Sequence, residues 1–130
     1  MAHSLKLLAA LSLATSLCGA AMAADHFTDV PLAPGDAGPW TVQSQGNAIC
    51  VVKLTSRKEG PSGYGLQAPA SCGASLPAGV SGWTPTANGM ALTDSGGQIL
   101  VSFERWSHSL LVSPKDSGFD LQLQRGGPTP

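Results

Sequence analysis

The sequence carries little charge, few aromatic side chains and no pattern typical of an amphipathic helix after its first residues. Only 12% of the 130 residues are Asp, Glu, Lys or Arg, and 5% are Phe, Trp or Tyr. No basic stretch is interleaved with aromatics, so nucleic acid is not an expected partner. In contrast, the chain contains 16 glycines and 10 prolines. Few charges, many turn formers and recurring short blocks of Val, Leu and Ile indicate a compact β protein and not a disordered chain.

The first 23 residues have the three-part composition of a secretory signal peptide. Lys6 provides the charged region, an apolar run extends from Leu7 to Leu17, and Ala21-Met22-Ala23 is a small-residue cleavage site. The run is shorter than the roughly 20 residues that span a bilayer core, and no stop-transfer pattern follows it. We therefore expect cleavage after Ala23, export to the periplasm and no stable membrane anchor.

Three cysteines are present, and Cys18 lies inside the predicted signal peptide. Lipid attachment would need a small residue just before the cysteine, whereas Leu17 occupies that position, which argues against the lipoprotein alternative. Removal of the signal leaves Cys50 and Cys72, and an even number of cysteines in an oxidising compartment is typical of a disulfide. The loop-entropy model assigns this crosslink about 3 kcal/mol, a large part of the stability of a small domain.

The remaining residues, 24–130, are enough for one small domain with one core. They contain six basic and eight acidic residues, a net charge near −2. Residues 24–39 show no periodicity but hold three prolines and two glycines, which predicts an extended N-terminal arm. Prolines limit the conformations of such an arm before it binds, and this lowers the cost of ordering it in a groove. A frayed terminus is the alternative interpretation.

From Trp40 onward, short apolar blocks alternate with turn signals, as in antiparallel strands joined by tight turns. Asn88-Gly89 and Asp94-Ser95-Gly96-Gly97 are strong turn signals, and a polar loop is expected at residues 57–62. Eight strands are expected at residues 40–44, 48–54, 64–68, 80–84, 90–93, 98–104, 109–113 and 119–124. In the last of these, Phe119, Leu121 and Leu123 alternate with polar residues, which predicts one buried and one wet face.

Since no helix is expected after the signal, the sheet itself must enclose the core. Eight short strands in sequential hairpins do so by closing into a small all-β, antiparallel, up-and-down barrel over residues 40–125, which also removes exposed sheet edges. A two-sheet sandwich is the alternative, and residues 126–130 form a C-terminal tail. The three tryptophans are expected in the core or at the barrel ends, with a ligand-stacking surface as the alternative.

Signatures of catalysis and of metal binding are absent from the sequence. There is no Gly-x-Ser-x-Gly motif, no phosphate-binding glycine loop and no cysteine left free to act as a nucleophile. After processing, His26 and His108 are the only histidines, and neither has a cysteine or carboxylate at metal-ligand spacing. A triad of Asp94, His108 and a serine can be imagined, but Asp94 is better explained as a turn residue. We therefore expect no enzyme activity, no intrinsic metal and no cofactor.

An ordered series of landmarks resembles a known family. The landmarks are Trp40, Cys50, Leu54, Tyr64-Gly65-Leu66, Pro69, Cys72, Trp83, Leu92, Asp94, Gly97, Leu100 and Phe103. Over most of the mature chain they resemble the Inh family of bacterial secreted-protease inhibitors, the alkaline proteinase inhibitors, whose domain also occurs in an outer-membrane lipoprotein. The resemblance implies a periplasmic eight-stranded barrel that blocks serralysin-type zinc metalloproteases by inserting an N-terminal trunk into the active-site cleft. It also matches Cys50 and Cys72 to the family disulfide.

By the same resemblance, the arm before Trp40 is the trunk, and its first five residues contact the protease. These residues are Ala24, Asp25, His26, Phe27 and Thr28, which differ from the small, hydroxyl-rich start of the best-known inhibitors. Four groups are competent donors to the protease zinc: the Ala24 amine, a nearby carbonyl, the Asp25 carboxylate and a neutral His26 imidazole. For His26, the alternative is a solvated terminal side chain without a metal. The expected partner is a secreted bacterial protease, bound by a monomer.

Two further functions stay open from the sequence. One is a barrel that binds a small apolar ligand in its interior, as lipocalin-like proteins do, and the other is an envelope protein that keeps the fold but does not inhibit. An interior filled by Trp83, Met90, Phe103 and Leu121 would exclude the first of these.

Overall fold

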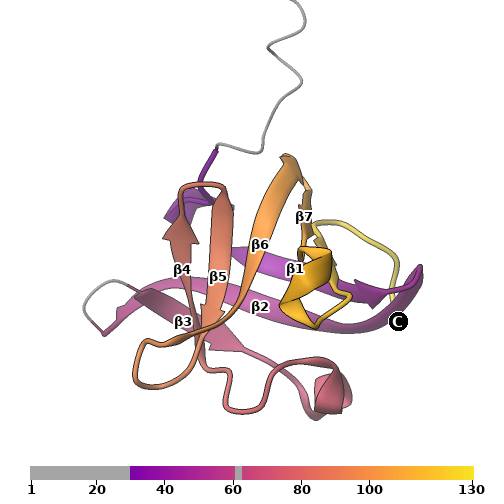
Figure 1. The fold of residues 1–130 in the computed structure, drawn as a ribbon, viewed down its shortest axis with the longest axis horizontal. Coiled ribbons are helices and arrows are strands. Elements are labelled where there is room, and N and C mark those ends of the chain that lie inside the picture. The colour runs from indigo at the N-terminus through magenta and orange to yellow at the C-terminus, as the bar shows by residue number, and fades with distance from the viewer. Residues whose placement is uncertain (1–29, 61–62) are drawn as a thin grey trace, which may run out of the picture.

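The computed structural model describes residues 30–60 and 63–130, so the predicted signal peptide and the trunk residues 24–28 lie outside the described residues. Eight antiparallel strands follow one another around a closed barrel, in which β8 pairs with β1 (Figure 1). The strands are β1 Gly38–Ser44, β2 Asn47–Glu59, β3 Gly63–Gln67, β4 Gly82–Thr86, β5 Gly89–Thr93, β6 Ile99–Ser107, β7 Leu110–Val112 and β8 Gln122–Gln124. Three 3₁₀ turns accompany them: η1 Pro34–Asp36, η2 Ala70–Ser75 and η3 Lys115–Ser117. The predicted up-and-down barrel is confirmed, and the sandwich alternative is wrong.

The ends of several strands differ from the prediction, most of all in β2. This strand continues through Arg57 to Glu59, so the polar loop predicted from Arg57 onward is wrong for its first half. The pairing of β2 with β3 advances from Leu54 opposite Leu66 to Lys58 opposite Tyr64, which places a bulge in β2. A bulged strand with exposed charged side chains has the local composition of a loop, although it continues the sheet.

The barrel interior is filled by large apolar side chains. Trp40, Trp83 and Met90 have no exposed surface, and Phe103 and Leu121 are 1% and 3% exposed. These side chains belong to one continuous core cluster, which excludes the lipocalin-like ligand site inside the barrel. Of the three tryptophans expected in the core or at the barrel ends, Trp40 and Trp83 lie in the core, whereas Trp106, near the end of β6, is 55% exposed.

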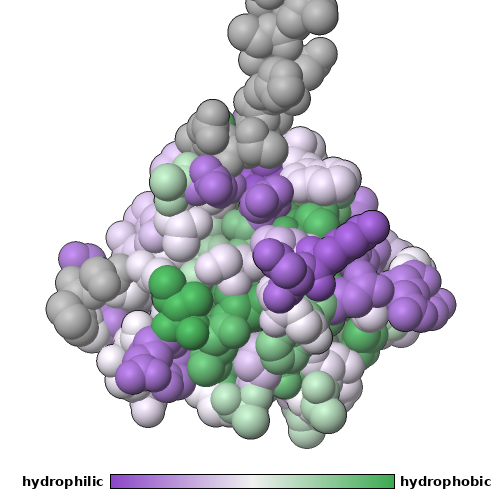
Figure 2. Space-filling view, in the orientation of Figure 1, coloured by the Kyte–Doolittle hydropathy of each residue, from purple (hydrophilic) through white to green (hydrophobic). Residues whose placement is uncertain are grey.

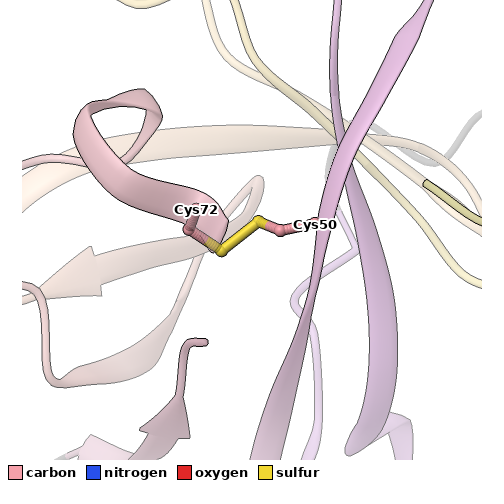
Figure 3. The surroundings of a disulfide bond; sticks show 2 residues. All are labelled: Cys50 and Cys72. Carbon is pink, nitrogen blue, oxygen red and sulfur yellow. A yellow bond between two sulfur atoms is a disulfide. The ribbon is translucent and has the colours of Figure 1, made fainter. Parts of the chain in front are cut away.

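The disulfide joins β2 to the connection between β3 and β4. Alternation along β2 directs Cys50, Val52 and Leu54 inward, and Cys72 lies in η2, with its Cα 5.2 Å from that of Cys50 (Figure 3). Both cysteines are buried. The predicted pairing is confirmed, and η2 is thereby held against the barrel wall.

The outer surface is mixed, and on the face shown in Figure 2 several hydrophobic areas lie between polar ones. Ile99, at the beginning of β6, is 57% exposed. Single exposed apolar side chains are ordinary on a protein surface, so the exposure of Ile99 alone does not indicate a binding site.

Candidate functional site

Three segments meet at one end of the barrel: the base of the N-terminal arm (residues 30–37), the β4–β5 turn (residues 87–88) and the β6–β7 turn (residues 108–109) (Figure 1). We call this the arm end. The Leu32 amide donates to the Gly89 carbonyl at 2.7 Å, and Arg105 Nη1 donates to the Pro31 carbonyl at 3.4 Å. The base of the arm is therefore bound to the strands beside both turns.

Leu32 fastens the arm to the core. Its side chain is 1% exposed and belongs to the core cluster, while Pro31 and Ala33 on either side are exposed. Burial of a leucine side chain contributes about 1.5 to 3 kcal/mol. The arm thus has one apolar anchor just after the point where the described chain begins.

Asp36 forms the second anchor, at the end of η1. Its Oδ2 accepts from the Ala33 amide at 2.9 Å and from Arg105 Nη1 at 3.3 Å, and its Oδ1 accepts from Arg105 Nη2 at 3.2 Å. The carboxylate and the guanidinium therefore form a two-point ion pair, the stronger and more directional form of this interaction. The pair joins segments that are 69 residues apart.

Arg105 is 4% exposed, yet all five of its N–H donors have acceptors. Besides Pro31 and Asp36, Nε donates to the Ser107 carbonyl and Nη2 to the His108 carbonyl, both at 3.2 Å. A buried guanidinium is tolerated when its charge is paired and its donors are satisfied. Arg105 consequently ties the arm base, β6 and the β6–β7 turn into one unit.

Arg125 closes the same cluster from the other side. Its Nη2 donates to the Asp36 carbonyl and lies 3.4 Å from Asp36 Oδ1, and its guanidinium stacks over the Trp40 ring at 4.8 Å. The Trp40 indole N–H also donates to the Asp36 carbonyl, at 3.1 Å. We call Leu32, Asp36, Arg105 and Arg125 the arm clamp.

Two opposing effects act on the Asp36 carboxyl. Burial disfavours its charge, but the Ala33 amide, the hydrogen bonds from Arg105 and the charges of Arg105 and Arg125 outweigh burial, so the pKa of Asp36 is lowered from 3.8. The carboxyl is ionised at neutral pH, and the clamp is then fully charged.

The landmark residues of the sequence have structural roles. The Trp83 indole N–H donates to the Thr55 carbonyl at 3.0 Å, and its ring stacks on Tyr64. Asp94 Oδ1 accepts from the amides of Gly96 and Gln98, each at 2.9 Å, and Gly97 has a φ of 85°, which favours glycine. Asp94 is a turn residue, as predicted, and its carboxylate is occupied by that turn.

The structure does not place the predicted trunk, because residues 24–28 lie outside the described residues. It adds the arm clamp, which the sequence analysis missed. Within residues 30–60 and 63–130, no group of three or more His, Cys, Asp or Glu side chains is arranged to hold a metal. Over that same range, none of the helices is long and apolar enough to cross a membrane.

Comparisons with known proteins agree with the fold. The sequence model of the family described as "Protease inhibitor Inh" matches residues 36–125. A protein of Pseudomonas aeruginosa named "Proteinase inhibitor" is 35% identical to the chain over 95 residues, covering 71% of the chain and 72% of that protein. The matched region begins at Asp36 and includes the arginines of the arm clamp.

Proposed function

Because the chain belongs to the Inh family of protease inhibitors, we propose that it inhibits a secreted serralysin-type zinc metalloprotease by inserting its N-terminal arm into the active-site cleft. The observation that carries this proposal is the arm clamp, which binds the base of the arm at Leu32 and Asp36. A segment that leaves a rigid support at a defined point loses less freedom on binding than a free terminus does.

The short distance between trunk and clamp supports the same mechanism. Thr28 and Leu32 are separated by four peptide steps, which span at most about 14 Å in a fully extended chain. If residues 24–28 enter a cleft, the arm end of the barrel must lie at its mouth. The barrel then covers the cleft while the trunk occupies it.

The first residues of the trunk are the proposed zinc donors. The Ala24 amine, a carbonyl beside it, the Asp25 carboxylate or the neutral His26 imidazole would replace the zinc-bound water of the protease. Loss of that water removes the nucleophile that a zinc protease uses. The reference pKa of histidine, about 6.5, differs from those of an amine and a carboxylate, so a role of His26 can be separated by experiment.

We further propose that the chain is exported to the periplasm, cleaved after Ala23, and acts there as a monomer without a membrane anchor. The Cys50–Cys72 disulfide supports export, because disulfides persist in oxidising compartments. N-terminal sequencing of protein from the periplasm should begin at Ala24, whereas recovery of a lipid-modified Cys18 in the membrane fraction would reverse this assignment.

Titration of the mature chain, residues 24–130, against a serralysin-type metalloprotease tests the proposed function. Stoichiometric loss of peptidase activity is expected. Parallel assays with trypsin and papain show whether inhibition extends to serine and cysteine proteases. No loss of metalloprotease activity at micromolar inhibitor would favour the alternative of an envelope protein that keeps the fold without inhibiting this protease class.

A further inference from the structure

Trp106 differs from the other two tryptophans in that its side chain is presented to solvent. Trp40 and Trp83 are fully buried, whereas Trp106 is 55% exposed. The pairing of β6 with β7 passes from Arg105 opposite Leu111 directly to Ser107 opposite Leu110, so Trp106 is an extra residue on β6. Val101, Phe103 and Arg105 on β6 are buried, so alternation along the strand places Trp106 on its outward face, and the bulge follows directly after Arg105.

The backbone on both sides of Trp106 is held firmly. The Arg105 amide donates to the Asn88 carbonyl at 2.8 Å, and the Arg105 side chain makes five hydrogen bonds. On the other side, the Ser107 carbonyl accepts from Arg105 Nε at 3.2 Å, and Ser107 Oγ accepts from the Ser109 amide at 3.2 Å. An exposed aromatic on a fixed backbone has little freedom to lose when a partner covers it.

Trp106 also lies at the arm end. Its neighbour Arg105 donates to the Pro31 carbonyl, and Pro31 follows the proposed trunk after only three peptide steps from Thr28, at most about 11 Å. A protease whose cleft holds residues 24–28 therefore lies close to the end of β6 that carries Trp106. This step rests on the proposed function.

We propose that Trp106 is a second protease contact, which packs against the rim of the active-site cleft while the trunk occupies its interior. The chemistry fits, since tryptophan is enriched among the few interface residues that carry most of the binding energy, and such residues are surrounded by contacts that add little energy but exclude water. Here the neighbours along the turn are Ser107, His108 and Ser109. The partner surface is an apolar or aromatic patch beside the substrate cleft.

A second copy of the chain is a poorer occupant than the protease. One exposed tryptophan among polar residues provides far less than the roughly 1,200 Å² that a stable interface buries. Against a protease, the same side chain adds to the area that the trunk already buries, so a small surface is enough to strengthen binding.

Ile99 offers a matched control on the same strand. It is 57% exposed at the beginning of β6, whereas Trp106 lies near the end of β6. In the mature full-length chain, Trp106→Ala should raise the inhibition constant for a serralysin-type metalloprotease at least tenfold, and Ile99→Ala should change it less than threefold. Equal effects of the two substitutions would overturn the inference.

A spectroscopic readout separates contact from folding. The wild-type chain labelled with 5-fluorotryptophan should give three ¹⁹F resonances, and the one missing from Trp106→Phe belongs to Trp106. Addition of unlabelled protease to the labelled wild-type chain should shift this resonance, while those of the two buried tryptophans change little. An unshifted Trp106 resonance under full inhibition would overturn the inference but leave the proposed function intact. A wild-type chain that does not inhibit overturns both. A Trp106 resonance that moves with inhibitor concentration alone would assign the surface to a second copy and refute the protease contact.

Discussion

The arm clamp predicts a specific effect of Asp36→Asn. The substitution keeps the size of the side chain but removes the charge that pairs with Arg105, whose side chain is 5% exposed. Removal of one partner of a buried ion pair costs about 3 to 5 kcal/mol because the other charge stays buried. Since the Asp36 side chain is 20% exposed and Arg105 keeps three carbonyl acceptors, we expect a loss near the lower end, about 3 kcal/mol.

The assay is urea unfolding of the mature chain, with the free energy obtained by linear extrapolation. Asp116→Asn is the matched control, because Asp116 is an exposed acidic residue in η3, and substitutions at such positions usually change stability by less than about 0.5 kcal/mol. The inhibition constant should rise for Asp36→Asn, since the arm base loses its ion pair, and stay constant for Asp116→Asn. Indistinguishable stability and inhibition in the two variants would refute the clamp.

The lowered pKa of Asp36 gives this prediction a pH dependence with a definite sign. A group whose pKa is lower in the folded state contributes stability above its unfolded pKa, and this contribution disappears as the pH falls through the folded pKa. The stability difference between wild type and Asp36→Asn should therefore be constant from pH 5 to 8 and decrease below about pH 4. A difference that grew on acidification would contradict the assigned ion pair.

Three further predictions follow from the anchor, the disulfide and the trunk. Leu32→Ala should destabilise the barrel by about 2 to 5 kcal/mol in the same unfolding assay, as removal of a buried leucine leaves a cavity, and a loss below 0.5 kcal/mol would show that the anchor is not used. Mass spectrometry of periplasmic protein should show Cys50 joined to Cys72, and replacing either cysteine should cost about 2 to 5 kcal/mol, whereas two free thiols would defeat the scaffold argument. If His26 binds the protease zinc, inhibition should weaken below about pH 6.5 in wild type but not in His26→Ala, because only the neutral imidazole is a ligand. Identical pH profiles of wild type and His26→Ala would show that His26 is not the zinc ligand, and the other donors of the trunk would then be the candidates.

The barrel could be predicted because its signals are local in the sequence. The turns at Asn88-Gly89 and at Asp94 to Gly97 depend on residues within a few positions of one another, and the turn hydrogen bonds of Asp94 reach only to Gln98. Strand alternation similarly predicts which face of a strand is buried. Such features need no knowledge of distant contacts.

The arm clamp could not be predicted, since it depends on contacts between distant residues. Leu32 lies in a short, proline-containing segment with no periodicity to mark it as buried, and its amide donates to the carbonyl of Gly89, 57 positions later in the sequence. The Asp36–Arg105 pair spans 69 residues. A buried arginine in β6 would be assigned to the surface from composition alone, so the inward series Val101, Phe103 and Arg105, which places Trp106 on the outward face, is not evident from the sequence.

Deletion of residues 24–28 tests the central claim, that the arm inhibits and the barrel supports it. The deletion leaves the arm clamp and the core in place, so the unfolding midpoint and the Cys50–Cys72 disulfide should be unchanged while inhibition of a serralysin-type metalloprotease is lost. An unchanged inhibition constant in a folded deletion variant would show that the barrel itself makes the inhibitory contact, and the trunk mechanism would have to be abandoned.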